Sequence, residues 1–448
     1  MLSAESFWTS SLRLVSQGPS ITRILAAAIA AVEPGAAVRR FVRLDGEILS
    51  VSGRAYDLRS YNRVVLLGIG KASVAMSDAM VDILGEWLSA SLVITKHIPN
   101  IPHIPLTILP GDHPVPDVLS LKAGQKTIEL VSSLGSEDLL LCLISGGGSA
   151  LVTAPLEGLS LADMQALTSA LLACGASVDE INTLRRHLDR VKGGGIAELS
   201  NGATIVSLIL SDVVGNPFEA IASGPTAPDP SMPLEALSIL AKYGLEDQIP
   251  PSIYAALRSS PGTSGPDDPI FKKVQNVLVG SNLLAAQAAL KRAQEEGFHP
   301  YLLRTDLQGE ARQAAFELAT FLRQTWKTGF PVPAPACIIA GGETTVTMKG
   351  NGKGGRNTEL ALAAVSALAH FPNVMLITLA TDGEDGATDA AGAVVTGETF
   401  QHAAGLGLNP EHYLERNDSY SFFELLGDLL KPGSTGTNVN DLVFLFTC

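Results

Sequence analysis

Short apolar runs alternate with segments of helical periodicity through most of the chain, and this alternation limits the possible folds more than any other feature. Residues 62–70 read NRVVLLGIG, and the next segment, KASVAMSDAMVDILGEWL, has its apolar residues at helical spacing. The same order of an apolar run and a polar end recurs in LLLCLISGGG and TIVSLILSDVVG. A strand that is apolar along its whole length is typical of a sheet buried on both faces. The pattern therefore predicts right-handed βαβ units and a parallel sheet covered by helices.

Two stretches rich in turn residues interrupt this pattern, at residues 223–233 and 259–269. The second, SSPGTSGPDDP, has no periodicity and is the better candidate for a linker. A length of 448 residues predicts two or three domains. We therefore place the domain boundary between about residues 235 and 270, and expect one domain at 1–245 and a second at 246–448.

The composition limits the partners of the protein. Apolar residues make up 46% and charged residues 17% of the chain, which supports large buried cores. The net charge is −14 and the sequence has no basic stripe, so we expect no nucleic-acid partner. No apolar run reaches the ~18–20 residues that cross a bilayer, so we expect no membrane partner and a cytoplasmic location. The oligomeric state stays open between a monomer and a homodimer.

Glycine and polar residues gather at the ends of the expected strands, in GIGK, SGGGS, SDVVG, GGET and TDGEDG. Ligands of open α/β sheets bind outside the carboxyl ends of the strands, so the shared placement predicts a ligand site there. SDVVG places Asp212 at such a strand end. A carboxylate in this position can bind Mg²⁺, accept a proton or only cap a turn.

The GIGKAS motif at residues 68–73 matches neither standard nucleotide-binding motif. A Walker A loop needs glycine where Val65 stands and Ser or Thr where Ala72 stands. The dinucleotide fingerprint needs a third glycine where Ser73 stands. What remains is Lys71 at the expected start of a helix, where free N–H groups and the helix dipole favour an anion. The alternative is a surface lysine that turns toward solvent.

The SGGGS motif at residues 145–149 is not a nucleophile elbow, because Leu151 stands where the final glycine of that motif is needed. A glycine-rich turn can instead present successive backbone N–H groups to an anion. The alternative is a tight turn that needs glycine for positive φ. Three consecutive glycines exceed the need of such a turn, so we favour an anion-binding loop assisted by the Ser145 and Ser149 hydroxyls.

The segment EINTLRRHLDRVKGGG at residues 180–195 predicts a helix that ends at glycines. Asn182, Arg186 and Asp189 would share one face of this helix, and Lys192 would continue that face. The alternative is a solvated helix with salt bridges on its surface.

The second half of the chain combines cations and carboxylates at its glycine motifs. GNGKGGRNTE places Lys353 and Arg356 at an expected helix start, which suits phosphate or carboxylate. TDGEDGATDAAGA carries four acidic residues, Asp382, Glu384, Asp385 and Asp389. Together these motifs suggest a metal–phosphate centre, and the alternative is a set of Asx turns. ACIIAGGETTVTMKG predicts a strand pair bent at Gly341-Gly342.

These motifs, in this order, resemble those of the class II glycerate kinases, the glycerate 2-kinase family with a C-terminal MOFRL domain. The matching stretches lie between residues 68 and 442: GIGKA, GDHPVPD, LISGGGSAL, EINTLRRHLDRVKGG, SDVVGNPFEAIASGPTAPDP, GGETTVT, GKGGRNTEL, TDGEDGATDAAGA and TGTNVNDL. Several of them are too long for chance agreement.

The resemblance implies a Rossmann-like three-layer αβα N-terminal domain with a parallel sheet, a smaller α/β MOFRL domain at the C-terminus, and an active site in the cleft between them. It implies ATP-dependent phosphorylation of D-glycerate to 2-phosphoglycerate, with ATP and Mg²⁺ as cofactors. By the family pattern, Lys71 matches the functional lysine of the GIGKA loop and Arg356 matches the arginine of the GGRN loop. Phosphorylation at C2 and the choice of the D substrate rest on the resemblance alone.

The expected mechanism follows the needs of phosphoryl transfer, which are in-line positioning and charge stabilisation. Lys71 and Arg356 would contact the transferred phosphoryl group, and Asp212 would accept the hydroxyl proton. Arg186 and Lys192 would clamp the substrate carboxylate. The expected metal ligands are Asp212, Asp382 and Asp385. The expected substrate- and phosphate-binding residues are Gly68, Gly70, Ser145, Gly146, Gly147, Gly148, Ser149, Asn182, Arg186, Lys192, Glu343, Lys353 and Asn357.

Two other functions stay open at this point. The first is an NAD-dependent hydroxy-acid oxidoreductase, similar to a hydroxypyruvate reductase. The incomplete GxGxxG pattern and the lack of an acidic residue at the end of the next strand, which finishes at Lys96, count against it. The second is a non-catalytic anion-binding protein, which would need only the glycine loops. The residues also leave open whether SGGGS holds a carboxylate or a phosphate.

Overall fold

The computed structural model describes residues 2–98 and 106–448. The chain divides into two compact units. We name Pro34–Val279 the central unit, and Met1–Glu33 together with Gly280–Cys448 the terminal unit. The terminal unit therefore contains both ends of the chain, and the central unit is inserted between its two segments.

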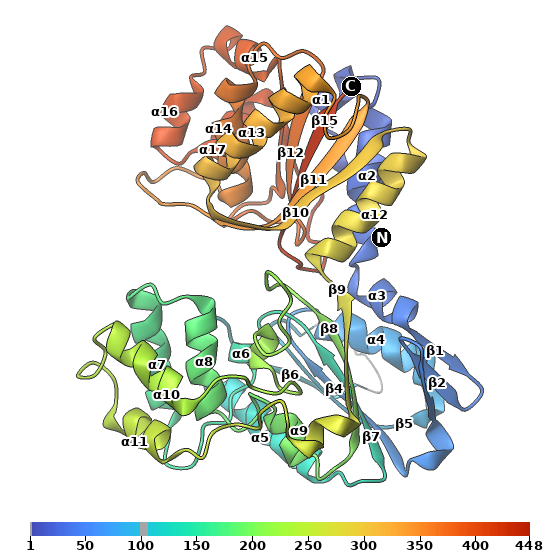
Figure 1. The fold of residues 1–448 in the computed structure, drawn as a ribbon, viewed down its shortest axis with the longest axis vertical. Helices are drawn as coiled ribbons and strands as arrows, with labels where there is room; N and C mark the ends of the chain where they lie inside the picture. The colour runs from blue at the N-terminus through green and yellow to red at the C-terminus, as the bar shows by residue number, and fades with distance from the viewer. Residues whose placement is uncertain (1, 99–105) are drawn as a thin grey trace. The chain divides into compact units, whose positions relative to one another are not determined.

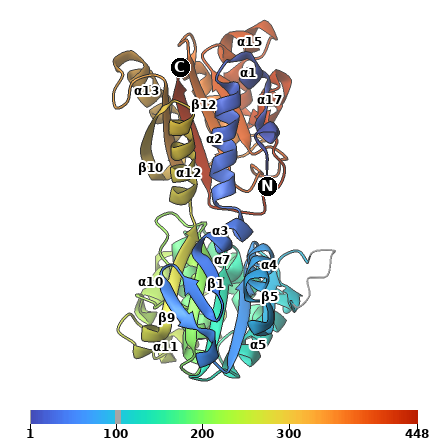
Figure 2. The same cartoon turned by 90° about the vertical axis from the view of Figure 1, so that its right-hand side faces the viewer.

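This division differs from the predicted one at 245/246 in two places. Helix α2 (Gly18–Ala31) packs along α12 (Asn282–Glu295), so the N-terminal segment belongs with the C-terminal one (Figures 1 and 2). Strand β9 (Val274–Gly280) joins the sheet of the central unit, so the turn-rich stretch at 259–269 lies inside that unit. Apolar periodicity shows that a helix is buried but does not identify the partner that buries it.

The central unit is built on a six-stranded sheet in the order β6-β5-β4-β7-β8-β9. The paired registers from β6 to β8 are parallel. Its other strands are β4 (Arg63–Ile69), β5 (Leu88–Thr95), β6 (Ile108–Pro110), β7 (Asp138–Ile144) and β8 (Thr204–Leu210). The predicted Rossmann-like αβα architecture with a parallel sheet is confirmed.

Alternate residues of β4 face different helices, as the pleat requires. Val65, Leu67 and Ile69 lie in one core with α5 (Val118–Ser132) and α9 (Gly195–Leu199), whereas Gly68 lies against α4 (Ser73–Leu84). The remaining helices of the unit are α3 (Pro34–Phe41), α6 (Gly148–Leu151), α7 (Leu161–Ala173), α8 (Val178–Leu188), α10 (Pro233–Lys242) and α11 (Pro251–Ser259). Strands β1 (Val42–Asp45), β2 (Ile48–Val51) and β3 (Arg54–Asp57) form a separate antiparallel sheet that the sequence did not predict.

The helix predicted over residues 180–195 is wrong beyond Leu188. Asp189 is extended and forms a bridge with Pro155, and Lys192 lies in a turn before α9 begins. The Asp189 carboxylate accepts hydrogen bonds from the Thr153 hydroxyl (2.7 Å) and the Ala154 N–H (3.0 Å). These tertiary bonds outweigh the local helix preference, and Asp189 and Lys192 therefore do not continue a helical face with Arg186.

The terminal unit has a six-stranded mixed sheet in the order β10-β11-β15-β12-β13-β14, in which only β10 and β11 pair in parallel among the described strands. Its strands are β10 (His299–Glu310), β11 (Ala336–Thr345), β12 (Val374–Ala380), β13 (Gly392–Thr396), β14 (Leu429–Leu430) and β15 (Asp441–Thr447). Figure 1 shows α13 (Ala311–Thr328) and α14 (Arg356–Leu368) on one face and α2 and α12 on the other. Its smaller helices are α1 (Ser10–Leu14), α15 (Thr399–Gly405), α16 (Pro410–Glu415) and α17 (Ser419–Leu426).

The strand pair predicted around Gly341-Gly342 is wrong, because residues 336–345 form the single strand β11. Gly342 has a φ of +146° and lies against the backbone of Leu307, where the register of β10 shifts. A β-bulge with a close backbone approach is a usual role of glycine within a strand. The glycine pair therefore marks an irregularity of the sheet and not a turn.

Within residues 2–98 and 106–448, no single helix is long and apolar enough to cross a membrane. One bent pair, α2 with α3, meets the requirement only when both helices are counted together. The cytoplasmic location stays a prediction.

Candidate functional site

Two glycine loops of the central unit meet because they follow neighbouring parallel strands. β4 leads into GIGK and β7 leads into SGGGS, and their registers align residue by residue. The Lys71 N–H donates to the Gly146 carbonyl (3.0 Å), and the Ala72 N–H donates to the Ser145 hydroxyl (3.0 Å). Ser145 therefore serves the start of α4, and its hydroxyl is already engaged.

The three glycines of SGGGS each have a packing or conformational reason. Gly147 has a φ of +82°, in the region that favours glycine. A side chain at Gly146 would collide with the Asp212 carboxylate, and one at Gly148 would collide with Ala222. Among the described residues, no acceptor is present for the N–H groups of Gly147, Gly148 and Ser149. The anion-binding prediction therefore rests on these open N–H groups and not on the number of glycines.

The predicted residues of this loop region lie close together. Asp212 follows β8, is partly buried and lies against Gly146. Lys71 is exposed, and its side chain crosses Gly147, where a Cβ would lie 3.2 Å from the Lys71 Cε. The structure thus brings Lys71, the SGGGS loop and Asp212 to one edge of the sheet. Gly70, with a φ of +126°, allows the close approach to Ser145.

Asn182 and Ser149 belong to a hydrogen-bonded chain behind the loop. The Ser149 and Ser223 hydroxyls lie 2.7 Å apart, and the Ser223 hydroxyl donates to Asn182 Oδ1 (3.0 Å). Asn182 Nδ2 donates to the Ala220 carbonyl (3.2 Å), and the side chain is buried. Asn182 therefore supports the loop from behind, which does not favour its predicted contact with substrate.

His113 lies beside Gly147, and the cations Lys96 and Arg185 lie beside the carbonyls of His113 and Pro114; none of these three was among the predicted site residues. The His113 ring borders Gly147, the Lys96 ammonium lies 3.5 Å from the His113 carbonyl oxygen, and Arg185 Nη2 lies 3.4 Å from the Pro114 carbonyl oxygen. Burial, together with the charges of nearby cations, lowers the pKa of His113 to about 4. The GDHPVPD motif contains His113, but no local pattern shows that it reaches a loop that follows another strand.

Arg186 and Lys192 are each held by a buried carboxylate. Arg186 Nε lies 2.8 Å from Asp229 Oδ1, and Lys192 Nζ lies 2.6 Å from Asp189 Oδ2. The side chains are 6% and 3% exposed, and Lys192 also donates to the Val152 carbonyl. These internal pairs do not support the predicted carboxylate clamp, because a substrate would have to displace a buried partner of each.

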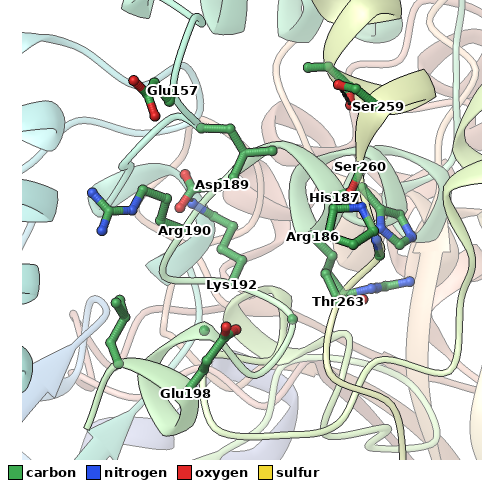
Figure 3. A pocket seen from close by; sticks show the side chains of 17 residues that line it. Glu157, Arg186, His187, Asp189, Arg190, Lys192, Glu198, Ser259, Ser260 and Thr263 are labelled. Atoms are coloured by element: carbon green, nitrogen blue, oxygen red, sulfur yellow. Dashed lines mark hydrogen bonds and ion pairs between the residues drawn. The ribbon is translucent and has the colours of Figure 1, made fainter. Parts of the chain in front are cut away.

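A cavity of about 620 Å³ in the central unit is lined in part by these pairs. Figure 3 shows Lys192 and Asp189 pointing toward one another, with Arg186 and His187 on the opposite side. Its lining contains neither Lys71 nor the SGGGS loop nor Asp212. This cavity is therefore separate from the loops that present open N–H groups.

In the terminal unit, the glycine loop at residues 349–355 is held by the segment Arg416–Tyr420, which we name the clamp segment. Asn417 Oδ1 accepts the N–H groups of Lys349 (2.8 Å) and Gly350 (3.0 Å). Farther along the loop, the Lys353 N–H donates to Asp418 Oδ1 (3.1 Å), and its carbonyl accepts the Tyr420 N–H (2.9 Å). The segment was not predicted, because RNDSY has none of the glycine or strand-end signals that mark the other motifs.

Lys353 is exposed, and its ammonium lies 3.6 Å from the centre of the Tyr420 ring. Such a cation–π contact holds a charge in place without neutralising it. The Tyr420 hydroxyl accepts from Lys431 Nζ (2.6 Å) and donates to Asp389 Oδ1 (2.6 Å). Lys353 is therefore positioned by the clamp segment and remains available to an anion.

Arg356 begins α14 and is shared by two carboxylates. Its Nε lies 2.5 Å from Asp441 Oδ2, and its Nη1 lies 2.7 Å from Glu343 Oε1. Burial favours the neutral guanidine, but the charge of Asp441 outweighs it and raises the pKa of Arg356. Glu343 was predicted to bind substrate or phosphate, yet it acts here as a counter-charge. Asp441, at the start of β15, was missed although TNVNDL was among the quoted motifs.

Asp385 caps α14 and does not lie open to a metal ion. Its carboxylate accepts the N–H of Asn357 (2.9 Å) and both the N–H and the hydroxyl of Thr358 (2.7 Å each), and its side chain is buried. The predicted metal-ligand role of Asp385 is therefore not supported, and the backbone N–H of Asn357 is also engaged. Asp382 is only partly buried and accepts the Glu384 N–H (3.1 Å). Within the described ranges, no group of three or more His, Cys, Asp or Glu residues is placed to hold a metal ion.

Comparison with known proteins adds a family to this geometry. Residues 20–258 match a domain of unknown function (DUF4147), and residues 336–441 match the MOFRL family. The chain is 43% identical over 387 residues to the D-glycerate 2-kinase of Thermotoga maritima, covering 85% of this chain and 90% of that relative. It is 39% identical over 388 residues to an Agrobacterium vitis protein provisionally named hydroxypyruvate reductase, covering 86% and 87%.

A solved structure agrees with the sequence relatives. The crystal structure of glycerate kinase from Thermotoga maritima matches this fold with a TM-score of 0.85 at 39% identity. The match covers 95% of this chain and 98% of that chain. Identity of this level over nearly the whole of both chains exceeds what a shared fold alone would give. This protein therefore belongs to the glycerate 2-kinase family with a C-terminal MOFRL domain.

Proposed function

We propose that this protein is an ATP-dependent kinase that phosphorylates D-glycerate to 2-phosphoglycerate. The observation that carries the proposal is the 43% identity to a D-glycerate 2-kinase over 85% of the chain. That relative is named for D-glycerate as its substrate and for phosphorylation at position 2. The kinase prediction is therefore supported by identity over most of the chain and not only by the order of its motifs.

The chemistry of both units suits phosphoryl transfer, which needs positioning and charge stabilisation more than covalent catalysis. The central unit offers the exposed ammonium of Lys71 and the open N–H groups of the SGGGS loop. Asp212, partly buried beside that loop, is our candidate to accept the hydroxyl proton of the substrate. The terminal unit offers Arg356 and Lys353. That Lys71 and Arg356 act on the same phosphoryl group stays a prediction.

Mg²⁺ would act with the nucleotide by neutralising phosphate charge. Mg²⁺ usually takes one or two protein carboxylates and completes its shell with phosphate oxygens and water. The lack of a three-residue cluster among the described residues is compatible with that minimal demand. Of the predicted ligands, the partly exposed Asp212 and Asp382 fit such a role better than Asp385, whose side chain is buried against the start of α14.

The oxidoreductase alternative has the provisional names of two Agrobacterium vitis relatives in its favour. The local structure favours the kinase. A dinucleotide-binding sheet needs an acidic residue after the second strand to bind the ribose hydroxyls. Here β5 ends at Thr95 and is followed by Lys96. The cation would suit an anionic group and not a ribose diol.

One assay separates the candidates. Purified protein is incubated with Mg·ATP and D-glycerate, and ADP release is followed through a coupled enzyme. In parallel, hydroxypyruvate and NADH are supplied, and NADH oxidation is recorded. Glycerate-dependent ADP with no NADH oxidation supports the kinase, and the reverse result rejects it. Phosphorus NMR of the product then separates 2-phosphoglycerate from 3-phosphoglycerate.

A further inference from the structure

Basic side chains meet beside the SGGGS loop without a carboxylate bound to them. Lys96 and Arg185 approach His113 and Pro114 through the carbonyl contacts given above, and His113 Cδ2 lies 3.4 Å from where a Cβ of the middle glycine would be. Lys71 borders the same glycine. In the described part of the chain, none of the ion pairs of the central unit includes Lys71, Lys96 or Arg185.

The nearby carboxylates do not neutralise this group. Asp112 is exposed and accepts the N–H of His113 (2.7 Å), and Asp189 is already paired with Lys192. In a chain with a net charge of −14, such a gathering of positive charge is unusual. Like charges in a partly buried place repel one another, and a bound anion would relieve that repulsion.

His113 is neutral at pH 7, which suits a proposed anion site where Lys71, Lys96 and Arg185 already supply positive charge. Burial and the charges of Lys71, Lys96 and Arg185 lower its pKa to about 4. At pH 7 the ring is therefore neutral, so it can exchange hydrogen bonds with a substrate without adding a positive charge. The pKa supports a polar contact with substrate, although it leaves open which ring nitrogen carries the proton.

The character of the group favours a carboxylate over the nucleotide. A nucleotide triphosphate arrives with Mg²⁺, which usually takes one or two protein carboxylates, and among the described residues no ion pair joins a carboxylate to Lys96 or Arg185. A hydroxy acid arrives without a metal ion, and its planar carboxylate matches the fork of the Arg185 guanidinium. Arg185 is partly buried on α8, one position before the fully paired Arg186. The predicted carboxylate ligand, Arg186, is thus the neighbour of Arg185, the arginine whose charge lies near His113.

We propose that Lys96, His113 and Arg185 form the subsite that binds the carboxylate of the hydroxy-acid substrate, beside the open N–H groups of the SGGGS loop. This inference rests on the proposed kinase function for the identity of the substrate. It assigns the carboxylate end to the central unit and leaves Lys71 free for the phosphoryl group.

The test compares Arg185→Leu and Arg185→Lys with Arg190→Leu as the matched control. Arg190 is an exposed arginine on the same segment, and the structure gives its side chain no ion pair among the described residues. Arg185→Leu should raise KM for D-glycerate by about 10- to 100-fold, the scale of losing one charge-assisted contact, and change KM for ATP less than about twofold. Arg185→Lys should be intermediate because it keeps the charge and loses the fork. Lys96→Met provides a second variant outside α8 with the same expected direction.

Direct binding keeps this inference separate from the kinase proposal. Isothermal titration with D-glycerate, and with glycerol as the analogue without a carboxylate, is carried out without nucleotide. Wild-type protein should bind D-glycerate only, and Arg185→Leu should lose that binding. If the variants raise KM for ATP instead, or change neither KM, the carboxylate subsite is overturned. If wild-type protein binds D-glycerate but releases no ADP, the kinase proposal fails while the subsite stands.

Discussion

Asn417 of the clamp segment allows the most quantitative test of how the second glycine loop is held. It is buried and has a φ of +52°. Its Oδ1 accepts two loop N–H groups, and its Nδ2 donates to Glu359 Oε1 (3.1 Å). Each neutral hydrogen bond contributes about 0.5–1.5 kcal/mol and a bond to a charged group about 1.5–3 kcal/mol, with partial compensation by water. We therefore expect Asn417→Gly to lower the free energy of unfolding by about 2–4 kcal/mol.

Two other substitutions at this position separate the contributions. Asn417→Ala should be less stable than Asn417→Gly by up to about 1 kcal/mol. The left-handed backbone conformation is strained for alanine, and this strain exceeds the extra chain entropy that glycine loses on folding. Asn417→Asp keeps an acceptor for the loop but sets a second carboxylate beside Glu359. Repulsion between the two carboxylates favours a proton shared by them, which raises the pKa of the pair in the folded protein. The Asn417→Asp variant should therefore be stable at low pH and lose that stability as the pH rises toward 7.

The assay combines thermal unfolding at pH 5 and pH 7 with hydrogen exchange of the loop amides. The amides of Lys349 and Gly350 should lose protection in the Ala and Gly variants and keep most of it in the Asp variant at pH 5. Asn351→Ala changes an exposed asparagine of the same loop and should stay within about 0.5 kcal/mol of wild type. Unchanged exchange at those two amides in Asn417→Ala would refute the reasoning.

Three further predictions concern catalysis, metal binding and pH. Lys71→Ala and Arg356→Ala should each lower kcat by about 10²–10⁴ in the coupled ADP assay. If both act on one phosphoryl group, the double variant loses less than the product of the single losses, and fully multiplicative losses would argue against a shared target. Asp385→Asn should destabilise the protein by about 1–3 kcal/mol because it removes a buried cap, while half-saturation by Mg²⁺ stays unchanged; a tenfold shift in that value would restore Asp385 as a ligand. The hydrogen bond from Lys242, followed by smaller contributions, lowers the pKa of Glu180 to about 2. The Glu180 carboxylate therefore stabilises the protein above the unfolded pKa, and this stabilisation is lost as the pH falls toward 2. Glu180→Gln should lower the free energy of unfolding by about 1 kcal/mol at pH 7 and by less at pH 3, measured by denaturant unfolding.

Strand positions in the central unit were predictable because burial on both faces leaves an uninterrupted apolar run. Arg63–Ile69, Asp138–Ile144 and Thr204–Leu210 show this pattern, and the loops after them meet because parallel strands end at one edge. The meeting of Lys71 with the SGGGS loop follows from this rule alone. The part of the site that follows from strand order could therefore be predicted from the sequence.

Side-chain pairing was not predictable, because it depends on partners that are distant in the sequence. Arg186 was predicted to bind substrate but is paired with Asp229, and Asp385 was predicted to bind metal but accepts the N–H of Thr358 at the start of α14. Arg185 and Asn417 were missed because their partners, Pro114 and Lys349, follow elements far along the chain. Local periodicity describes which residues share a face, but it contains no information about the identity of the opposing surface.

The insertion of the central unit has a consequence for biosynthesis. Helix α2 leaves the ribosome before the whole central unit, yet the helix α12 that packs along it begins only at Asn282. During the whole of the intervening translation, α2 has only its contacts with η1 (Ala4–Phe7) and α1, and the side that packs on α12 stays uncovered. A nascent chain with such an orphan helix is a substrate for chaperones, whereas the central unit can fold as soon as Val279 has emerged. Expression of Gly280–Cys448 without the first 33 residues would leave the face of α12 that packs on α2 uncovered. A soluble fragment of this unit therefore has to contain both segments.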